Sequence, residues 1–379
     1  MPMVVDADTH VDETEATWEY MSEAEIQFKP ATVFPESIHP VHMKGGNSRF
    51  WLIDGHLQQR RLREDPETGE VLQPTGGTTV ATRELHDVPA RLRHMDELGL
   101  DVQVLYSTLF IDCVTTNPDE ERALTNSYNR WLAERTADSG GRLRWMIVPS
   151  LLDIDNAVDQ VRFGGKHGAC GVMMKGGGRI DGTPVIDPYF FPLYREASAF
   201  NLPVCFHIGR AVQDPTLVNR FSTGSNPTRS FTHLFLLGTL TLLDAFHSLV
   251  ETKITEEFPD LRWGFIEASA SWVPYITYEL ERRRKKSRGR AALPQMTEVD
   301  NILERNRLYV TCLADENLAA IAESAGTGNL VIGTDYSHPD FSFDLQVVRL
   351  LRERAEKGEV GAALVEKILS DNGRALYGL

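Results

Sequence analysis

The sequence predicts an α/β protein, a distorted (β/α)8 TIM barrel with a long inserted cap after its first strand. Eight short apolar runs are each followed by a stretch with helical spacing, which is the strand count of a closed barrel and not of an open doubly wound sheet. A length of 379 residues suits one such barrel with an enlarged loop. The eighth run leads to a carboxylate, Asp335, and the active sites of such barrels lie where the strands end.

The predicted strands are short runs rich in β-branched and aromatic residues, as buried parallel strands are. In chain order they cover residues 3–8, 102–106, 144–148, 171–175, 203–207, 262–267, 308–311 and 329–332. Helical spacing predicts helices at 87–98, 118–137, 154–167, 191–200, 231–258, 272–284, 316–325, 343–357 and 362–369. Asp87 is expected to cap the first of these helices.

Residues 11–87 are predicted to form the cap, because a segment this long is too long for a simple connection. One hairpin is expected near residues 50–55. The barrel then comprises residues 1–10 and 88–379.

Aromatic residues of the cap predict an apolar lid over a hydrophobic or aromatic carboxylated substrate. The residues expected to bind this substrate are Trp18, Phe50 and Trp51 of the cap and Arg179 of the glycine loop after the fourth strand. The alternative is that these aromatic residues pack the segment onto the barrel or onto a second subunit.

Composition narrows the possible partners. The net charge of −15 argues against a nucleic-acid surface. The N-terminus shows no signal-peptide pattern, and the four cysteines are widely spaced and lie mostly within apolar runs, so we expect reduced thiols in a cytoplasmic protein.

No apolar run reaches the roughly 20 residues of a membrane span. The nearest candidate, residues 231–250, is interrupted by His233, Asp244 and His247. Its apolar residues fall on most faces of a helix, which predicts burial by a neighbour or by a second subunit, and we expect a homodimer.

Side chains that bind metals follow five of the predicted strands. They are Asp8 and His10, Lys175, His207, Glu267 and Asp335. Asp8 and His10 are two residues apart and leave the strand on one face, and closure of a barrel places Asp335 beside them. Any one of these residues alone is more often a helix cap or a core residue. Five positions at one end of the barrel predict a shared divalent metal, which would be Zn, Mn or Fe, as one ion or two.

Several motifs together resemble one known family. They are Asp8-x-His10, His207 at the end of 203–207, the run 258–262 leading into 265–269, and the run 333–338. The resemblance is to the amidohydrolase-related family, in the "amidohydrolase 2" branch that contains aminocarboxymuconate-semialdehyde decarboxylase and the resorcylate-type decarboxylases. It covers most of the chain except the cap.

This resemblance implies that Asp8, His10, His207 and Asp335 bind one divalent metal. The decarboxylases of the family carry a histidine after the sixth strand as an acid or base, whereas this chain has Glu267. A direct transfer of their mechanism is therefore in doubt.

Glu267 has a second interpretation, as a ligand of a second metal. Binuclear amidohydrolases bridge their two ions with a carboxylated lysine from the fourth strand, and Lys175 stands at that position. The alternative for Lys175 is a surface or substrate-facing ammonium. His233 and His247 are further candidate ligands, with packing or support of a ligand as the alternative for both.

Two reactions follow from such a site. In a hydrolysis the metal activates water, Asp335 takes the proton, and His338 orients the substrate. In a decarboxylation the metal binds a carboxylate or phenolate, and Glu267 protonates the ring carbon.

A third reaction follows from the ligand types. Asp8 and Glu267 make the site rich in oxygen ligands, which favours iron or manganese over zinc. The fold also resembles that of an oxygenase of natural-product biosynthesis, which implies a non-haem di-iron oxygenase as the alternative function. A metal-binding module without catalysis is the remaining alternative.

The basic run at residues 282–290 is expected to be a solvated helix end that complements the helix dipole. On so acidic a protein it could also bind the phosphates of an acyl-coenzyme A substrate.

Overall fold

The computed structural model describes residues 2–33, 47–64, 77–209, 227–287, 301–338 and 342–379. Within these ranges, only the backbone is described at 47–49, 59–64 and 227–237.

Eight parallel strands of the described chain form one sheet, in the order β1-β5-β6-β7-β8-β9-β10-β11. Their bounds are β1 Val5–Val11, β5 Val102–Ser107, β6 Leu143–Ile147, β7 Ala169–Lys175, β8 Val204–His207, β9 Trp263–Ile266, β10 Leu308–Cys312 and β11 Leu330–Ile332. The segment after β11 returns to β1, where the Asp335 amide donates to the Asp8 carbonyl at 3.0 Å. A bridge between Thr9 and Tyr336 continues this contact, so the sheet closes into the predicted barrel.

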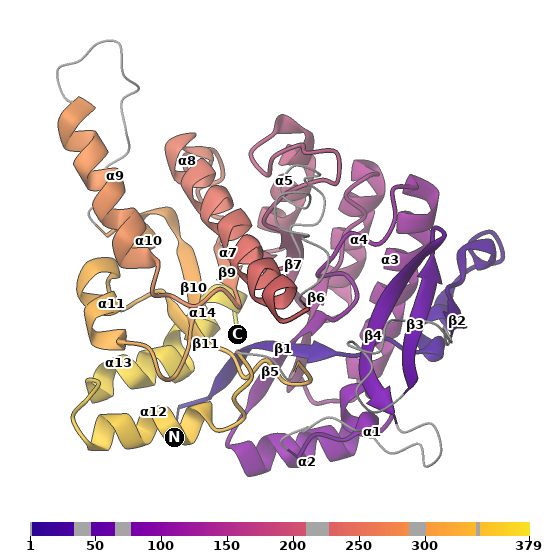
Figure 1. Ribbon diagram of the computed structural model, residues 1–379, viewed down its shortest axis with the longest axis horizontal. Helices are drawn as coiled ribbons and strands as arrows, with labels where there is room; N and C mark the ends of the chain where they lie inside the picture. Colours follow the sequence, from indigo (N-terminus) through magenta and orange to yellow (C-terminus); the bar gives the residue numbers. More distant parts are fainter. Residues whose placement is uncertain (1, 34–46, 65–76, 210–226, 288–300, 339–341) are drawn as a thin grey trace.

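The helices lie around the outside of these strands (Figure 1). They are α2 Val88–Leu98, α3 Pro118–Thr136, α4 Ile154–Lys166, α5 Phe191–Ala199, α7 Pro227–Glu251, α8 Ile254–Glu257, α9 Val273–Ser287, α10 Ile302–Asn306, α11 Leu318–Ala325, α12 Val347–Glu356, α13 Ala362–Glu366 and α14 Asn372–Tyr377. The side chain of Asp87 accepts a hydrogen bond from the Ala90 amide and caps α2, as predicted.

Two predicted helices differ from the observed ones. The predicted helix at 231–258 is divided into α7 and α8 at Lys253, whose φ of 59° places it in the left-handed region. The predicted helix at 362–369 continues through a π-helical turn, Lys367–Asp371, into α14.

Between β1 and α2 the chain forms 3₁₀ turns at Glu15–Tyr20 and Ile26–Phe28, a short helix α1 (Val80–Arg83) and a small antiparallel sheet. The described strands of this sheet are β2 Ala31–Val33, β3 Asn47–Ile53 and β4 His56–Glu64. The hairpin between β3 and β4 turns at Asp54 and Gly55, both with positive φ, so the predicted hairpin is present. Trp18 and Trp51 of this segment are buried in the same core as the barrel strands, and its status as a separate cap stays a prediction.

Among the described residues, none of the helices combines the length and the apolar character needed to cross a membrane. Cys113, Cys170, Cys205 and Cys312 all lie in the described part and are free thiols, as expected.

Candidate metal centre

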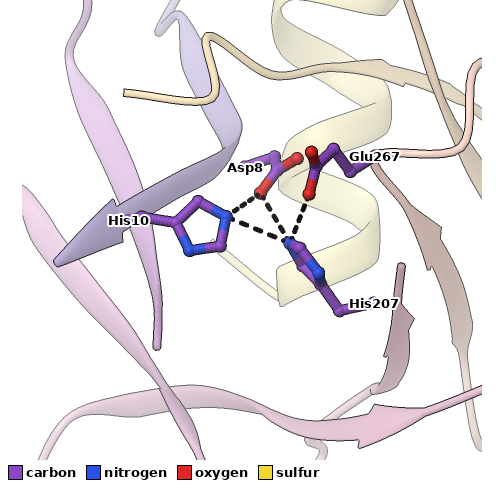
Figure 2. Close-up of side chains that lie close together, drawn as sticks. All are labelled: Asp8, His10, His207 and Glu267. Carbon is purple, nitrogen blue, oxygen red and sulfur yellow. Dashed lines mark hydrogen bonds and ion pairs between the residues drawn. The ribbon is translucent and has the colours of Figure 1, made fainter. Parts of the chain in front are cut away.

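Six polar side chains converge at the carboxyl ends of the barrel strands. Asp8 and His10 come from β1, His207 ends β8, Glu267 follows β9, and Asp335 and His338 follow β11. One ligand atom from each of Asp8, His10, His207 and Glu267 lies within 4.8 Å of the others, and all four side chains are buried (Figure 2). The same holds for a second, overlapping group that consists of His10, Glu267, Asp335 and His338. Of the residues predicted to converge, Asp8, His10, His207, Glu267 and Asp335 belong to one or both groups, and their role as metal ligands stays a prediction.

The two central histidines have their protons fixed by the backbone. His10 Nδ1 lies 3.1 Å from the carbonyl oxygen of Ser107, and His207 Nδ1 lies 2.7 Å from that of Ile208. A carbonyl oxygen only accepts, so each Nδ1 carries a hydrogen, and in the neutral form of each imidazole Nε2 has the lone pair. The two Nε2 atoms face each other at 3.1 Å. Two lone pairs at this distance repel unless a positive charge lies between them, which fits a metal ion.

Carboxylates surround this histidine pair. Asp8 Oδ1 lies 3.6 Å from His10 Nε2 and 3.4 Å from His207 Nε2, and Glu267 Oε2 lies 3.4 Å from His207 Nε2. Asp8 Oδ1 is buried, and it faces the Nε2 atoms of both histidines. A buried carboxylate oxygen needs a positive charge or a hydrogen-bond donor, so this position suits a cation.

The same charges act on His207. Burial would lower the pKa of His207, but the hydrogen bond and charge of Asp8 and the charge of Glu267 outweigh burial, so that its pKa is raised. The site therefore has a negative potential that attracts a cation.

Asp335 and His338 extend the cluster on the other side of His10. Asp335 Oδ1 lies 3.5 Å from His10 Nε2 and 3.3 Å from His338 Nδ1. The rings of His338 and His10 stack with centroids 3.5 Å apart and an interplanar angle of 20°. This stacking fixes the plane of both imidazoles.

The backbone at two of the carboxylates is strained. Asp335 has a φ of 49° and Glu267 a φ of 65°, a conformation that costs a non-glycine residue about 1–3 kcal/mol. Hydrogen bonds hold both in place, from the Asp335 amide to the Asp8 carbonyl at 3.0 Å and from the Glu267 amide to Thr311 Oγ1 at 2.7 Å. Such strain is typical of functional sites.

Two hydroxyl residues that were not predicted as site residues support these side chains. Ser342 donates to Glu267 Oε1 at 2.9 Å, and Thr108 Oγ1 lies 2.8 Å from His338 Nε2. A single serine or threonine in a loop belongs to no recognisable sequence pattern, so its role in a site cannot be predicted from the sequence. Asp12, which accepts from Thr108 at 3.2 Å, continues the alternation of Asp8 and His10, and that pattern could have identified it.

Lys175 lies beside the cluster, in register with His207 on the neighbouring strand. Burial lowers the pKa of Lys175, but the thiol of Cys113 and the charge of Glu121 outweigh burial, so that its pKa is raised. A carbamate forms on a neutral amine, so a raised pKa disfavours the carboxylated bridge. That role stays a prediction.

Among the described residues, His247 of α7 is not part of either group of four. His247 is half-buried, and the side chain of His233 lies outside the described residues. Their role as ligands stays a prediction.

The residues predicted to bind substrate lie against their own neighbours. Trp18 and Trp51 are buried and meet edge to face with ring centroids 5.7 Å apart, and Phe50 is half-buried in β3. Arg179 pairs with Asp181 at 3.0 Å and lies over the ring of Tyr189. Their contact with substrate stays a prediction.

The basic end of α9 forms ion pairs within its own helix. Arg282 pairs with Glu279 at 2.7 Å and Lys285 with Glu281 at 2.5 Å, as a solvated helix end would. Residues 288–290 of this run lie outside the described residues. Binding of an acyl-coenzyme A by this run stays a prediction.

Comparisons with known proteins agree with this architecture. The family model described as amidohydrolase matches residues 5–379. The chain is similar in structure to an amidohydrolase of Mycobacterium avium subsp. paratuberculosis K-10, with a TM-score of 0.75 and 17% identity, over 100% of this chain and 99% of the other. It is also similar to a 5-carboxyvanillate decarboxylase of Novosphingobium aromaticivorans in complex with manganese, with a TM-score of 0.61 and 17% identity, over 82% of this chain and 85% of the other. These likenesses confirm the predicted fold.

One curated relative is similar in sequence. It is a 2-keto-4-carboxy-3-hexenedioate hydratase of Sphingobium sp., 22% identical over 191 residues, which are 50% of this chain and 48% of the relative. The match thus spans about half the length of each chain.

Proposed function

Because the chain belongs to the amidohydrolase family, as the match over residues 5–379 shows, we propose that it is a metal-dependent decarboxylase of a carboxylated aromatic or otherwise hydrophobic small molecule. The observation that carries the proposal is the convergence of Asp8, His10, His207 and Glu267 within 4.8 Å. Four buried nitrogen and oxygen ligands of this kind suit a divalent cation.

The donor set suits Mn, Zn or Fe, since imidazole and carboxylate ligands bind all three. Manganese has additional support, because a structurally similar decarboxylase is a manganese complex. When bound, the ion supplies positive charge that binds a substrate carboxylate or phenolate and stabilises the charge that develops in the reaction.

Glu267 can be a metal ligand or a proton donor, and a decarboxylation requires it to act as the proton donor, with the ion held by Asp8, His10 and His207. Its Oε1 is held by the Ser342 hydroxyl and its Oε2 faces the histidine pair, so the carboxyl group is fixed at the edge of the site. As carbon dioxide leaves, the electron pair of the broken carbon–carbon bond stays on the substrate carbon. A proton held by Glu267 then adds to that carbon.

Addition of water is the second candidate, and the similarity to a hydratase favours it. In a hydration, as in a hydrolysis, a protein group must accept a proton from water. We assign this role to Asp335, and the assignment is supported by the distance of 3.5 Å between its Oδ1 and His10 Nε2.

A di-iron oxygenase is not proposed. The relatives named above are an amidohydrolase, a decarboxylase and a hydratase, and they give that alternative no support. A homodimer and a cytoplasmic location stay predictions from the sequence.

The reaction is tested by incubating metal-free protein, with and without added manganese, with a panel of hydroxylated benzoic acids and unsaturated keto acids. Carbon dioxide release, product mass and oxygen uptake are recorded together, with the His207→Ala variant as control. We expect manganese-dependent carbon dioxide release without oxygen uptake, and none from the variant. A product heavier than its substrate by one water would establish addition of water instead, and oxygen uptake coupled to turnover would contradict both.

A further inference from the structure

A chain of buried polar contacts leads from His338 away from the metal centre. His338 Nε2 lies 2.8 Å from Thr108 Oγ1, and Thr108 Oγ1 donates to Asp12 Oδ1 at 3.2 Å. The other oxygen of Asp12 accepts from Arg83 Nε at 3.0 Å. Arg83 in turn donates to the carbonyl of Ser337, the residue before His338, so the chain closes on itself. Thr108, Asp12 and Arg83 are 8%, 5% and 0% exposed.

The chemistry of this chain fixes the direction of each hydrogen bond. Asp12 Oδ2 accepts from the Arg83 guanidinium, and carboxylate oxygens only accept. Thr108 has one hydroxyl hydrogen, and this hydrogen is directed to Asp12. The Thr108 oxygen therefore accepts from His338, so that Nε2 of His338 carries the hydrogen. In a neutral imidazole, Nδ1 is then left with the lone pair.

That lone pair faces the metal centre. His338 Nδ1 lies 3.3 Å from Asp335 Oδ1. One ring nitrogen of His338 also belongs with His10, Glu267 and Asp335 to a group whose ligand atoms lie within 4.8 Å of one another. The ring cannot turn freely, because it stacks on His10 at 3.5 Å. A nitrogen lone pair and a carboxylate oxygen that face each other both require a positive charge between them.

We propose that Thr108 and Asp12 are positioning residues that hold His338 in the Nε2–H tautomer, so that its Nδ1 becomes a metal ligand beside Asp335. This inference rests on the proposed metal dependence of the enzyme. It adds His338 to the predicted ligands and gives Thr108 and Asp12, which are not ligands, a role in positioning it. Partners of ligating histidines fix the tautomer in this way in metalloproteins, and their loss weakens metal binding.

Thr108 is the position to test, because Asp12 is also the partner of a buried guanidinium and its loss would destabilise the protein. Thr108→Val removes the hydroxyl and keeps the shape of the side chain. The Nε2–H of His338 then has no acceptor at Thr108, and we expect the hydrogen to move to Nδ1, where it is donated to Asp335. Thr108→Ser restores the hydroxyl and serves as the rescue variant. Thr136→Val is the matched control, because Thr136 is also a buried threonine, 6% exposed, and its hydroxyl donates to the Leu132 carbonyl within α3.

The tautomer is read by NMR of metal-free protein that carries ¹⁵N-labelled histidine, with His338→Gln to assign the signals. We expect the Nε2–H form in the wild type, in Thr108→Ser and in Thr136→Val, and the Nδ1–H form in Thr108→Val. A wild-type protein with the Nδ1–H form would overturn the inference without the need for any variant.

Metal affinity is the second readout, measured by titration with Mn²⁺. We expect Thr108→Val to bind Mn²⁺ about 10- to 100-fold more weakly than the wild type, while Thr108→Ser and Thr136→Val bind it with nearly wild-type affinity. Equal affinities of the wild type and Thr108→Val would overturn the inference. Failure of this inference and failure of the proposed function can be told apart. If the wild type binds Mn²⁺ but turns over no carboxylated compound, the proposed function fails. The His338 tautomer and the Mn²⁺ affinity of the wild type relative to Thr108→Val would still test this inference.

Discussion

Gly333 lies so close to Asp8 that a Cβ at position 333 would overlap the Asp8 Cβ and lie 3.1 Å from the Asp8 carbonyl oxygen. Gly333 directly follows β11, and Asp8 lies within β1, so the contact is made where the barrel closes. The absence of a side chain lets the two segments approach, and the Asp335 amide can then reach the Asp8 carbonyl. Closure of the barrel and placement of two candidate ligands thus depend on the same glycine.

Gly333→Ala is therefore expected to displace Asp8. Overpacking of this kind costs about 1–3 kcal/mol of unfolding free energy, and we expect weaker Mn²⁺ binding as well. Gly328→Ala is the control, because no atom lies within 4 Å of a Cβ there. Denaturant unfolding and Mn²⁺ titration check the prediction, and equal behaviour of the two variants would contradict it.

Glu13 gives the protein a predicted dependence of stability on pH. Burial raises the pKa of Glu13 to about 7, against the hydrogen bond from Ser107, which lowers it. Between the ordinary pKa of 4.5 and about 7, the folded state holds a proton that the unfolded state has lost. Stability should therefore fall as pH rises through this window, by at most about 1.4 kcal/mol per pH unit for one group.

Glu13→Gln should make the fall of stability with pH less steep. It should not abolish the fall, because burial also raises the pKa of Asp6 to about 7. Unfolding free energies of the wild type and the variant, measured across the window, check this. Parallel profiles would show that Glu13 titrates normally.

Glu267→Gln separates two roles of the same carboxylate. A ligand should contribute at least as much to metal affinity as a residue that only supports a ligand. We therefore expect Glu267→Gln to weaken Mn²⁺ binding by about tenfold or more. Unchanged Mn²⁺ binding with abolished turnover would instead identify a proton carrier that is not a ligand. Ser342→Ala, which removes only the hydrogen bond to Glu267 Oε1, is the milder comparison. Unchanged binding and unchanged turnover would remove Glu267 from the site.

Lys175 is expected to be an ammonium and not a carbamate, because its pKa is raised. The number of Mn²⁺ ions bound per chain should then be the same with and without added bicarbonate, and Lys175→Met should still bind Mn²⁺. An increase from one ion to two on addition of bicarbonate, lost in Lys175→Met, would establish the bridging lysine.

The sequence predicted the barrel and most of the cluster because both follow from periodicity. The strands are apolar runs, and the ends of parallel strands in one barrel must meet, so Asp8, His207 and Asp335 could be placed together without coordinates. The bend at Lys253 could not be predicted, because a lysine carries no preference for the left-handed backbone that it adopts.

The directions of side chains were the second feature that could not be predicted from the sequence. Lys175 stands at the predicted strand end, yet the groups that raise its pKa include Cys113 and Glu121, which belong to the segments after β5. Thr108 is one of many threonines, and only its distance to His338 distinguishes it. Such pairings depend on the packing of loops, which periodicity does not describe.

Mn²⁺ bound per chain, measured by equilibrium dialysis and elemental analysis of the wild type and His207→Ala, tests the shared metal site most directly. His167→Ala is the matched control, because His167 is exposed and its Nδ1 lies 2.7 Å from the Phe163 carbonyl oxygen. We predict at least one ion per chain in the wild type and in His167→Ala, and loss of bound ion in a folded His207→Ala. A wild type that binds no ion, or a His207→Ala variant that binds as many ions with the same affinity, would contradict the account.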